Sequence, residues 1–139
     1  MDDVFTKQEG IVSALFKGLS SDEVERLFDS GLIVHFKKDE VVFYQGSMGN
    51  HVYLILSGSV GVYRDEKQIV TLDSGEIFGE MALFTKEPRS ATVKVLQDSQ
   101  LLIFSETSFH KLLTKQTAVR LLLNIINILC ERLKKKNEE

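Results

Sequence analysis

Near the start of the chain, hydrophobic residues recur with the period of a helix. In residues 11–30 the apolar positions Val24, Leu27 and Phe28 lie three or four residues apart, which places them on one helix face. Ser20 and Glu23 have the spacing of a capping box, and Gly31 follows where a helix would end. We therefore expect residues 1–31 to form an N-terminal helical part.

Between residues 32 and 105 the pattern changes to short apolar segments separated by glycines and polar turn residues. The expected strands cover residues 32–36, 41–44, 52–56, 60–63, 68–72, 91–95 and 100–104. Many short strands at near-regular spacing favour a sandwich, a barrel or a jelly roll. No helical segment of crossover length lies between them, so a parallel sheet is not expected.

From residue 105 onward the pattern is helical again. We expect a short helix around residues 109–113 and a long helix over residues 116–136, which would be about 30 Å long. The polar residues of the long helix form one narrow stripe: Arg120, Asn124, Asn127 and Glu131. The remaining apolar arc is about twice the width of roughly 100° that a surface helix usually buries.

Two apolar rows run along this long helix. The first row is Leu122, Ile125, Leu129 and Leu133, and the second is Val119, Leu123, Ile126 and Cys130. The helix is either deeply buried in its own domain, or one row packs on the β region and the other on a second helix. Because one small β domain cannot cover so wide an arc, we favour a homodimer through the long helix. The pattern does not say which row faces which surface.

Length and composition narrow the class of protein. The chain has 139 residues, 43% of them hydrophobic, and a formal net charge of −3, which fits one domain over residues 1–139. The negative balance argues against bulk nucleic-acid binding, and no segment reaches the roughly 20 apolar residues of a membrane span. The single cysteine, Cys130, and the absence of a secretory signal at the amino terminus place the protein in the cytoplasm.

The segment from Gly75 to Val93 carries the candidate chemistry, since it connects two β regions and includes a possible helical turn at residues 81–84. Arg89 offers a planar fork suited to phosphate oxygens, and Gly79 permits close backbone approach to a ligand. The carboxylate of Glu80 would repel a phosphate but suits a sugar hydroxyl. Together these residues indicate a phosphorylated sugar, although taken alone a glutamate and an arginine nine residues apart, such as Glu80 and Arg89, are more often a surface ion pair.

A wider pattern surrounds these residues. The sequence Phe78-Gly79-Glu80-Met81-Ala82-Leu83, five further residues and then Arg89-Ser90-Ala91-Thr92-Val93 closely resembles the phosphate-binding cassette of the cyclic nucleotide-binding domain family. Gly46, Gly49 and Gly58 around the apolar run 52–55 resemble the glycine-punctuated strands of the same family. The resemblance covers nearly the whole chain. It implies an antiparallel β-roll (a double-stranded β-helix or jelly roll) over residues 32–105, with its cassette at 78–91, and C-terminal helices over 106–139.

The resemblance also implies roles for individual residues. Glu80 would take the ribose 2′-hydroxyl, Arg89 the cyclic phosphate and Ser90 the phosphate or base, while backbone amides of Glu80, Ala82 and Ala91 complete the cradle. The implied ligand-binding set is Phe78, Gly79, Glu80, Met81, Ala82, Arg89, Ser90, Ala91, Ile69 and Val70.

Base recognition is the least constrained of these roles. Lys136 and Asn137 fall where bacterial regulators of the family reach the purine, but they differ from the small hydroxyl residues of the catabolite-activator type. Serine at position 90 is similar to bacterial cAMP sensors. We therefore expect cAMP in preference to cGMP.

No catalytic or metal-binding pattern competes with this interpretation. The chain lacks a nucleophile elbow and a phosphate-binding Walker loop, and His35, His51 and His110 lack ligand spacing, so we expect no enzyme, no cofactor and no metal. The favoured function is a cyclic nucleotide sensor that signals through its last helix and a dimer interface. Because the chain ends at Glu139, we expect no helix-turn-helix and no direct DNA binding by this chain. The alternatives are the sensor half of a Crp/Fnr-type transcription regulator and a ligand-free β-roll scaffold.

Overall fold

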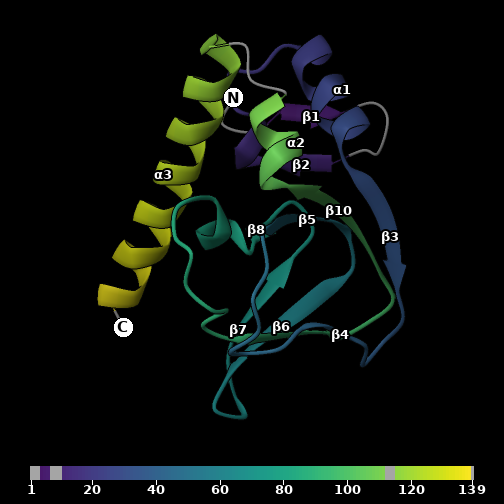
Figure 1. Ribbon diagram of the computed structural model, residues 1–139, viewed down its shortest axis with the longest axis vertical. Helices are drawn as coiled ribbons and strands as arrows, with labels where there is room; N and C mark the ends of the chain where they lie inside the picture. Colours follow the sequence, from purple (N-terminus) through teal and green to yellow (C-terminus); the bar gives the residue numbers. More distant parts are fainter. Residues whose placement is uncertain (1–3, 7–10, 112–114, 139) are drawn as a thin grey trace.

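The computed structural model describes residues 4–6, 11–111 and 115–138. Two four-stranded antiparallel sheets form a β-roll, with helices gathered at one end and a long helix along one side (Figure 1). The first sheet has the order β3-β10-β5-β8, and the second has the order β4-β9-β6-β7. The fold is therefore the mainly β architecture that the resemblance implied, with an N-terminal helix and a long C-terminal helix.

The observed strands agree closely with the apolar segments of the sequence. In the first sheet they are β3 (Leu32–Phe36), β5 (His51–Ser57), β8 (Ile77–Phe78) and β10 (Ser99–Ser105). In the second sheet they are β4 (Val41–Phe43), β6 (Ser59–Arg64), β7 (Lys67–Asp73) and β9 (Thr92–Val95). The pattern did not predict β8, which is only two residues long and pairs with Tyr53 and Leu54 of β5. A segment this short carries no period of its own.

The N-terminal part differs from the prediction. Instead of one helix over residues 11–30, the structure has a hairpin of β1 (Val4–Thr6) and β2 (Ile11–Ser13), a 3₁₀ turn η1 (Ala14–Phe16) and the helix α1 (Ser21–Ser30). The helical interpretation of residues 11–13 was wrong. The capping box was correct: Ser20 and Glu23 exchange side-chain to backbone hydrogen bonds at the start of α1.

Two further helices follow β10. The short helix α2 spans Glu106–Lys111, earlier in the chain than the expected residues 109–113, of which 112 and 113 lie outside the described residues. The long helix α3 spans Lys115–Glu138, two residues longer than expected at its C-terminal end. Figure 1 shows α3 running from the helical end of the molecule down along the β-roll. Its C-terminal turns therefore reach the level of the cassette.

Strand β5 separates two hydrophobic clusters, because its side chains are buried on both faces. Val52, Leu54 and Leu56 face the cluster shared with η1, α1 and α3, whereas Tyr53 and Ile55 face the interior of the roll. This two-sided burial explains why residues 52–56 form an unbroken apolar run in the sequence. Strand β5 also pairs with β8 and contacts η2, and the cassette begins at these two elements.

Helix α3 meets the domain through a face that carries Ile125 and Leu129 of the first apolar row together with Leu121 and Ile128, which belong to neither row. Leu121 and Ile125 are fully buried in the helical cluster, with Ile128 and Leu129 packed against it. Asn124, from the polar stripe, is also buried, and its amide donates hydrogen bonds to the carbonyls of Leu15 and Lys17 at 2.8 and 2.7 Å. The stripe is therefore not one solvent-facing surface. Asn124 supplies hydrogen-bond donors to two carbonyls around η1.

Candidate functional site

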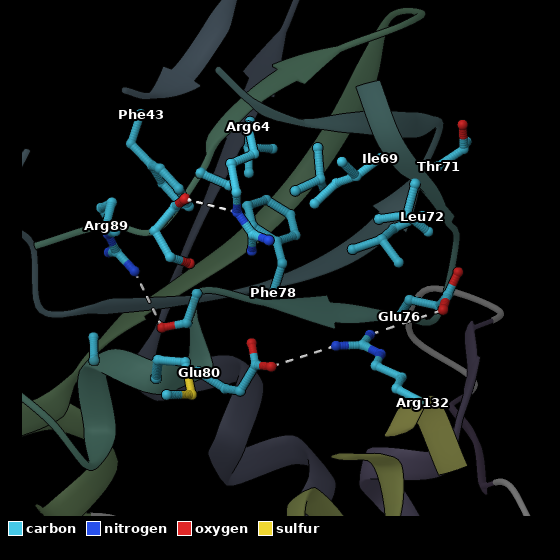
Figure 2. A pocket seen from close by; sticks show the side chains of 18 of the residues that line it. Phe43, Arg64, Ile69, Thr71, Leu72, Glu76, Phe78, Glu80, Arg89 and Arg132 are labelled. Carbon is cyan, nitrogen blue, oxygen red and sulfur yellow. Dashed lines mark hydrogen bonds and ion pairs between the residues drawn. The ribbon is translucent and has the colours of Figure 1, made fainter. Parts of the chain in front are cut away.

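A cavity of about 1050 Å³ lies between β6, β7, the cassette and the C-terminal turns of α3. A volume of this size suits a small organic ligand. The residues that the sequence predicted for the ligand site and that line the cavity are Ile69, Val70, Phe78, Gly79, Glu80, Met81, Ala82, Arg89, Ser90, Ala91 and Lys136. Asn137 is exposed and is not among the lining residues. The fold thus brings the C-terminal turns of α3 beside residues 69–91, which lie far from them in the chain (Figure 2).

Arg89 is the buried cation of the cavity. Only 9% of the residue is exposed, and its Nη1 and Nη2 atoms donate to the carbonyls of Gly79 and His51 at 3.2 and 3.0 Å. Its backbone is fixed by reciprocal hydrogen bonds with the loop before β5: the Arg89 amide donates to Ser47, and the Gly46 amide donates to the Arg89 carbonyl. Hydrogen bonds within the protein therefore fix both the backbone and the guanidinium of Arg89.

The positive charge of the Arg89 guanidinium is only partly balanced by the groups around it. Burial lowers the pKa of the Arg89 guanidinium, against the opposing influence of Tyr53 and Glu80, and its Nε atom is buried without a hydrogen-bond partner. Carbonyl dipoles satisfy two donors but carry no net charge. Because a buried unpartnered donor on a cation is costly, the arrangement favours an anion beside this guanidinium.

Two glycines make room for the Arg89 side chain. A Cβ atom on Gly49 would lie 2.8 Å from Nη2, and one on Gly79 would lie 3.0 Å from Nη1. Gly79 also has a φ of 78°, the left-handed conformation from which the 3₁₀ turn η2 (Glu80–Leu83) starts. The sequence predicted that Gly79 lets a ligand approach the backbone, and in this structure the side chain that lies against Gly79 is that of Arg89.

Glu80 is buried at the same site, with 7% of the residue exposed. Its Oε1 accepts from Nη1 of Arg132 on α3 at 3.4 Å, and Nη2 of Arg132 donates to the carbonyl of Ile77 at 2.7 Å. Figure 2 shows Arg132 reaching from α3 toward Glu80 and Glu76. The interpretation of Glu80 and Arg89 as a surface ion pair is wrong, because both residues are buried and each has other partners.

Sequence reasoning missed several residues of the cavity. Phe43 lies over Arg89, Arg64 of β6 donates to the carbonyl of Ser90 at 3.4 Å, and Arg132 pairs with Glu80. Helical periodicity offered a signal for Arg132, since it lies one turn before Lys136 on the same face of α3. No pattern in the sequence singles out Phe43 or Arg64, because their approach to the cassette depends on the pairing of β4 and β6 with β9.

The other predicted residues occupy the walls and the rim. Phe78 and Ala91 are buried, whereas Ile69, Val70 and Met81 are about half exposed and present apolar surface to the cavity. The amide of Ala82, implied as a cradle donor, donates to the carbonyl of Gly79 at 3.2 Å, so a ligand would have to replace that partner. The site combines a cation for an anion, a buried carboxylate for a hydroxyl and an apolar wall. This combination matches a phosphorylated nucleoside.

A comparison with known families decides which class of site this is. Residues 33–116 match the family described as "Cyclic nucleotide-binding domain". The chain belongs to this family. It is a family of non-catalytic regulatory domains. The cassette predicted from the sequence, with Glu80 and Arg89, lies within the matched residues.

Individual relatives of this cyclic nucleotide-binding domain agree. The chain is 30% identical to the "Cyclic AMP receptor protein" of Thermus thermophilus over 132 residues, which cover 91% of this chain and 60% of that protein. The crystal structure of the Thermus thermophilus catabolite activator protein superposes with a TM-score of 0.79 at 29% identity, over 88% of this chain and 59% of that chain. The sensor domain of the transcriptional regulator DNR from Pseudomonas aeruginosa gives 0.69 at 29%, over 90% and 86%. The chain therefore spans about 60% of the length of the two Thermus thermophilus relatives.

The described residues include neither a metal-ligand group nor a membrane-spanning helix. Among the described residues, no group of three or more histidine, cysteine or acidic side chains is placed to hold a metal ion. Of the helices that the structure describes, none is both long enough and apolar enough to cross a lipid bilayer.

Replacing Gly49 by alanine should weaken ligand binding about tenfold, because the new Cβ atom would displace the Arg89 guanidinium. Gly49 does not have a positive φ, so its backbone accepts alanine and the domain should stay folded. Calorimetric titration with cyclic nucleotide and a thermal melt separate the two effects. Met48→Ala, which alters an exposed neighbour in the same loop, is the matched control. Unchanged affinity in Gly49→Ala would show that Arg89 does not need this approach to the backbone.

Proposed function

We propose that this domain binds a cyclic nucleotide, cAMP in preference to cGMP, and transmits its presence through α3. The observation that carries the proposal is the buried Arg89, whose charge has only carbonyl dipoles as hydrogen-bond acceptors, in a cavity shared with the buried Glu80. In this assignment Arg89 pairs with the cyclic phosphate and Glu80 accepts from the ribose 2′-hydroxyl. Ser90 donates near the phosphate or base, and Lys136 lies over the base.

The contacts of Arg132 supply a route from ligand to helix. Arg132 joins α3 to Glu80 and to the carbonyl of Ile77, which precedes the cassette. A ribose hydroxyl at Glu80 would compete for the same carboxylate and so alter how the end of α3 is held. The change in helix position is limited by the difference in ligand affinity between the two arrangements.

The outward face of α3 supports a dimer in this proposal. Val119, Leu123, Ile126 and Leu133 are 50 to 61% exposed, and Cys130 is exposed between them. These five positions are spaced four, three, four and three residues apart, which is the spacing of a coiled-coil seam. We infer that a second copy of α3 covers this row.

The cellular setting follows from the same proposal. We propose a cytoplasmic domain that does not contact DNA through residues 1–139. Since the chain spans 60% of a cyclic AMP receptor protein, the sensor part of a longer transcription regulator is the second candidate, and the gene's reading frame decides between them. A ligand-free scaffold is disfavoured, because burying the Arg89 guanidinium with an unpartnered Nε atom is costly unless an anion binds beside it.

Calorimetric titration with cAMP, cGMP and 2′-deoxy-cAMP tests the function and the base preference together. We expect cAMP to bind most tightly, and binding of cGMP at least tenfold tighter would overturn the base preference. No binding of any of the three would overturn the proposed function.

Glu80→Gln should weaken binding of cAMP but hardly change that of 2′-deoxy-cAMP, because the analogue lacks the hydroxyl that the carboxylate accepts from. The loss for a hydrogen bond to a charged group should be about tenfold or more. Glu87→Gln, which changes an exposed carboxylate at the same cavity rim, is the control. If the wild-type protein binds 2′-deoxy-cAMP as tightly as cAMP, Glu80 does not contact the ribose.

A further inference from the structure

Two aromatic rings lie beside the guanidinium of Arg89, and a third ring packs against both of them. Its Cζ atom lies 4.2 Å from the ring centroid of Phe43 and 5.9 Å from that of Tyr53. Phe78 completes the group, stacked on Tyr53 with centroids 4.8 Å apart and planes inclined by 2°, and 6.0 Å from Phe43. We call Phe43, Tyr53 and Phe78 the aromatic cluster. Its members come from β4, β5 and β8, so both sheets contribute to it.

The aromatic cluster supplies what the hydrogen bonds of Arg89 do not. The face of an aromatic ring carries partial negative charge and attracts a cation, most strongly where water is excluded. Phe43 presents its face at the shortest distance, and Arg89 is 9% exposed. The rings therefore offset part of the energy of burying the guanidinium.

The placement of Phe43 distinguishes it from a residue that only fills the core. Phe43 is half-buried, packs against the cluster inside the roll and also lines the ligand cavity. An arginine side chain has several rotatable bonds, and one at a cavity edge can swing toward solvent. A ring against the guanidinium favours the inward position, in which its remaining donors are available to an anion.

We propose that the aromatic cluster, and Phe43 above all, is a positioning element that holds the Arg89 guanidinium ready for the ligand's anionic group. The proposal rests on the proposed function for the identity of that group. The inference goes beyond the proposed function, because it makes the affinity for the ligand depend on the electron density of the Phe43 ring that contacts Arg89.

The direction of the effect follows from comparing the free and bound proteins. When the attraction of the ring weakens, the free protein relaxes by letting Arg89 swing toward solvent. The bound protein cannot relax in this way without giving up its contact with the phosphate. The bound state therefore loses more than the free state, and affinity falls.

Incorporation of fluorinated phenylalanines at position 43 tests this electronic effect with little change of shape. With one, two and three ring fluorines the negative charge on the ring face decreases stepwise. We expect the Kd for cAMP to rise at each step, by about three- to thirtyfold in total. The same series at Phe28, which packs on Phe16 in the other hydrophobic cluster, is the control and should leave the Kd unchanged. An unchanged or falling Kd across the Phe43 series would overturn the proposal.

A second measurement keeps the inference separate from the proposed function. Thermal unfolding of the ligand-free protein should show a stepwise fall in Tm across the Phe43 series, and this fall should vanish in an Arg89→Met background. If that coupling is absent, Phe43 does not hold Arg89 and the proposal fails. If the coupling is present while the wild-type protein binds no cyclic nucleotide, the proposed function fails and the positioning role of Phe43 stands.

Discussion

Replacing Arg89 by alanine should weaken cyclic nucleotide binding at least tenfold. A hydrogen bond to a charged group contributes about 1.5–3 kcal/mol, and each 1.4 kcal/mol corresponds to a factor of ten in Kd. Arg89→Lys should recover little, because an ammonium cannot reproduce the planar fork or its stacking on Phe43. Calorimetry with cAMP measures both changes. Equal affinity in the wild-type protein and Arg89→Ala would end the assignment of the phosphate site.

Replacing Arg89 by methionine should not destabilise the ligand-free domain. Arg89 is buried with an unpartnered Nε atom, and replacing such a charge by an apolar side chain of similar length is often neutral or stabilising. We therefore expect Arg89→Met to melt at or above the wild-type temperature while losing its ligand. Arg26→Ala, on the exposed face of α1, is the matched control for the loss of a surface arginine. A large fall in the melting temperature of Arg89→Met would show that Arg89 supports the fold rather than the ligand.

The sequence predicted best the strands that coincide with nearly continuous apolar runs. The run at residues 52–56 became the two-sided strand β5, and the segment 32–36 became β3 with the same limits. The failures have local causes. Residues 11–13 were assigned to a helix, whereas the structure pairs them with Val4–Thr6 in a hairpin, a contact between segments that no periodicity encodes. In a similar way β8 exists only because β5 offers it hydrogen bonds.

The residues of the candidate site also fall into two groups, those that the sequence predicted and those that it missed. Glu80, Arg89 and their neighbours lie in one contiguous segment with a recognisable spacing, so the sequence predicted them. Phe43, Arg64 and Arg132 enter the cavity from β4, β6 and α3, and only the tertiary structure brings them there. Asn124 shows the converse case. The sequence places it in a polar stripe, but in the structure its side chain is buried and donates hydrogen bonds to the carbonyls of Leu15 and Lys17.

The structure also decides between the two apolar rows of α3, which the sequence left open. Ile125 is 1% exposed and Leu122 and Leu129 are half-buried, so that row faces the domain. Leu133 was grouped with them, but it is 61% exposed and extends the outward row instead. The outward row is thus Val119, Leu123, Ile126, Cys130 and Leu133. This assignment gives opposite predictions for charged substitutions in the two rows.

Charge on the outward row should produce folded monomers, whereas charge on the inward row should unfold the domain. We expect Leu123→Glu with Ile126→Glu to keep the wild-type circular dichroism and to halve the molar mass measured by light scattering. Ile125→Glu should instead lose cooperative unfolding, because it buries a carboxylate without a partner at a site that is 1% exposed, at a cost of several kcal/mol.

Cys130 supplies an independent test of the same interface. In a parallel pair of helices, equivalent positions of the seam meet across the twofold axis, so two copies of Cys130 would approach each other. Since the chain has one cysteine, mild oxidation should yield disulfide-linked dimers from the wild-type protein and none from Cys130→Ser. The cross-linked yield should depend on cAMP if Arg132 and the ligand compete for Glu80, because the end of α3 would then shift. A wild-type protein that is monomeric at tens of micromolar, with and without saturating cAMP, would mean that no second helix covers the outward row.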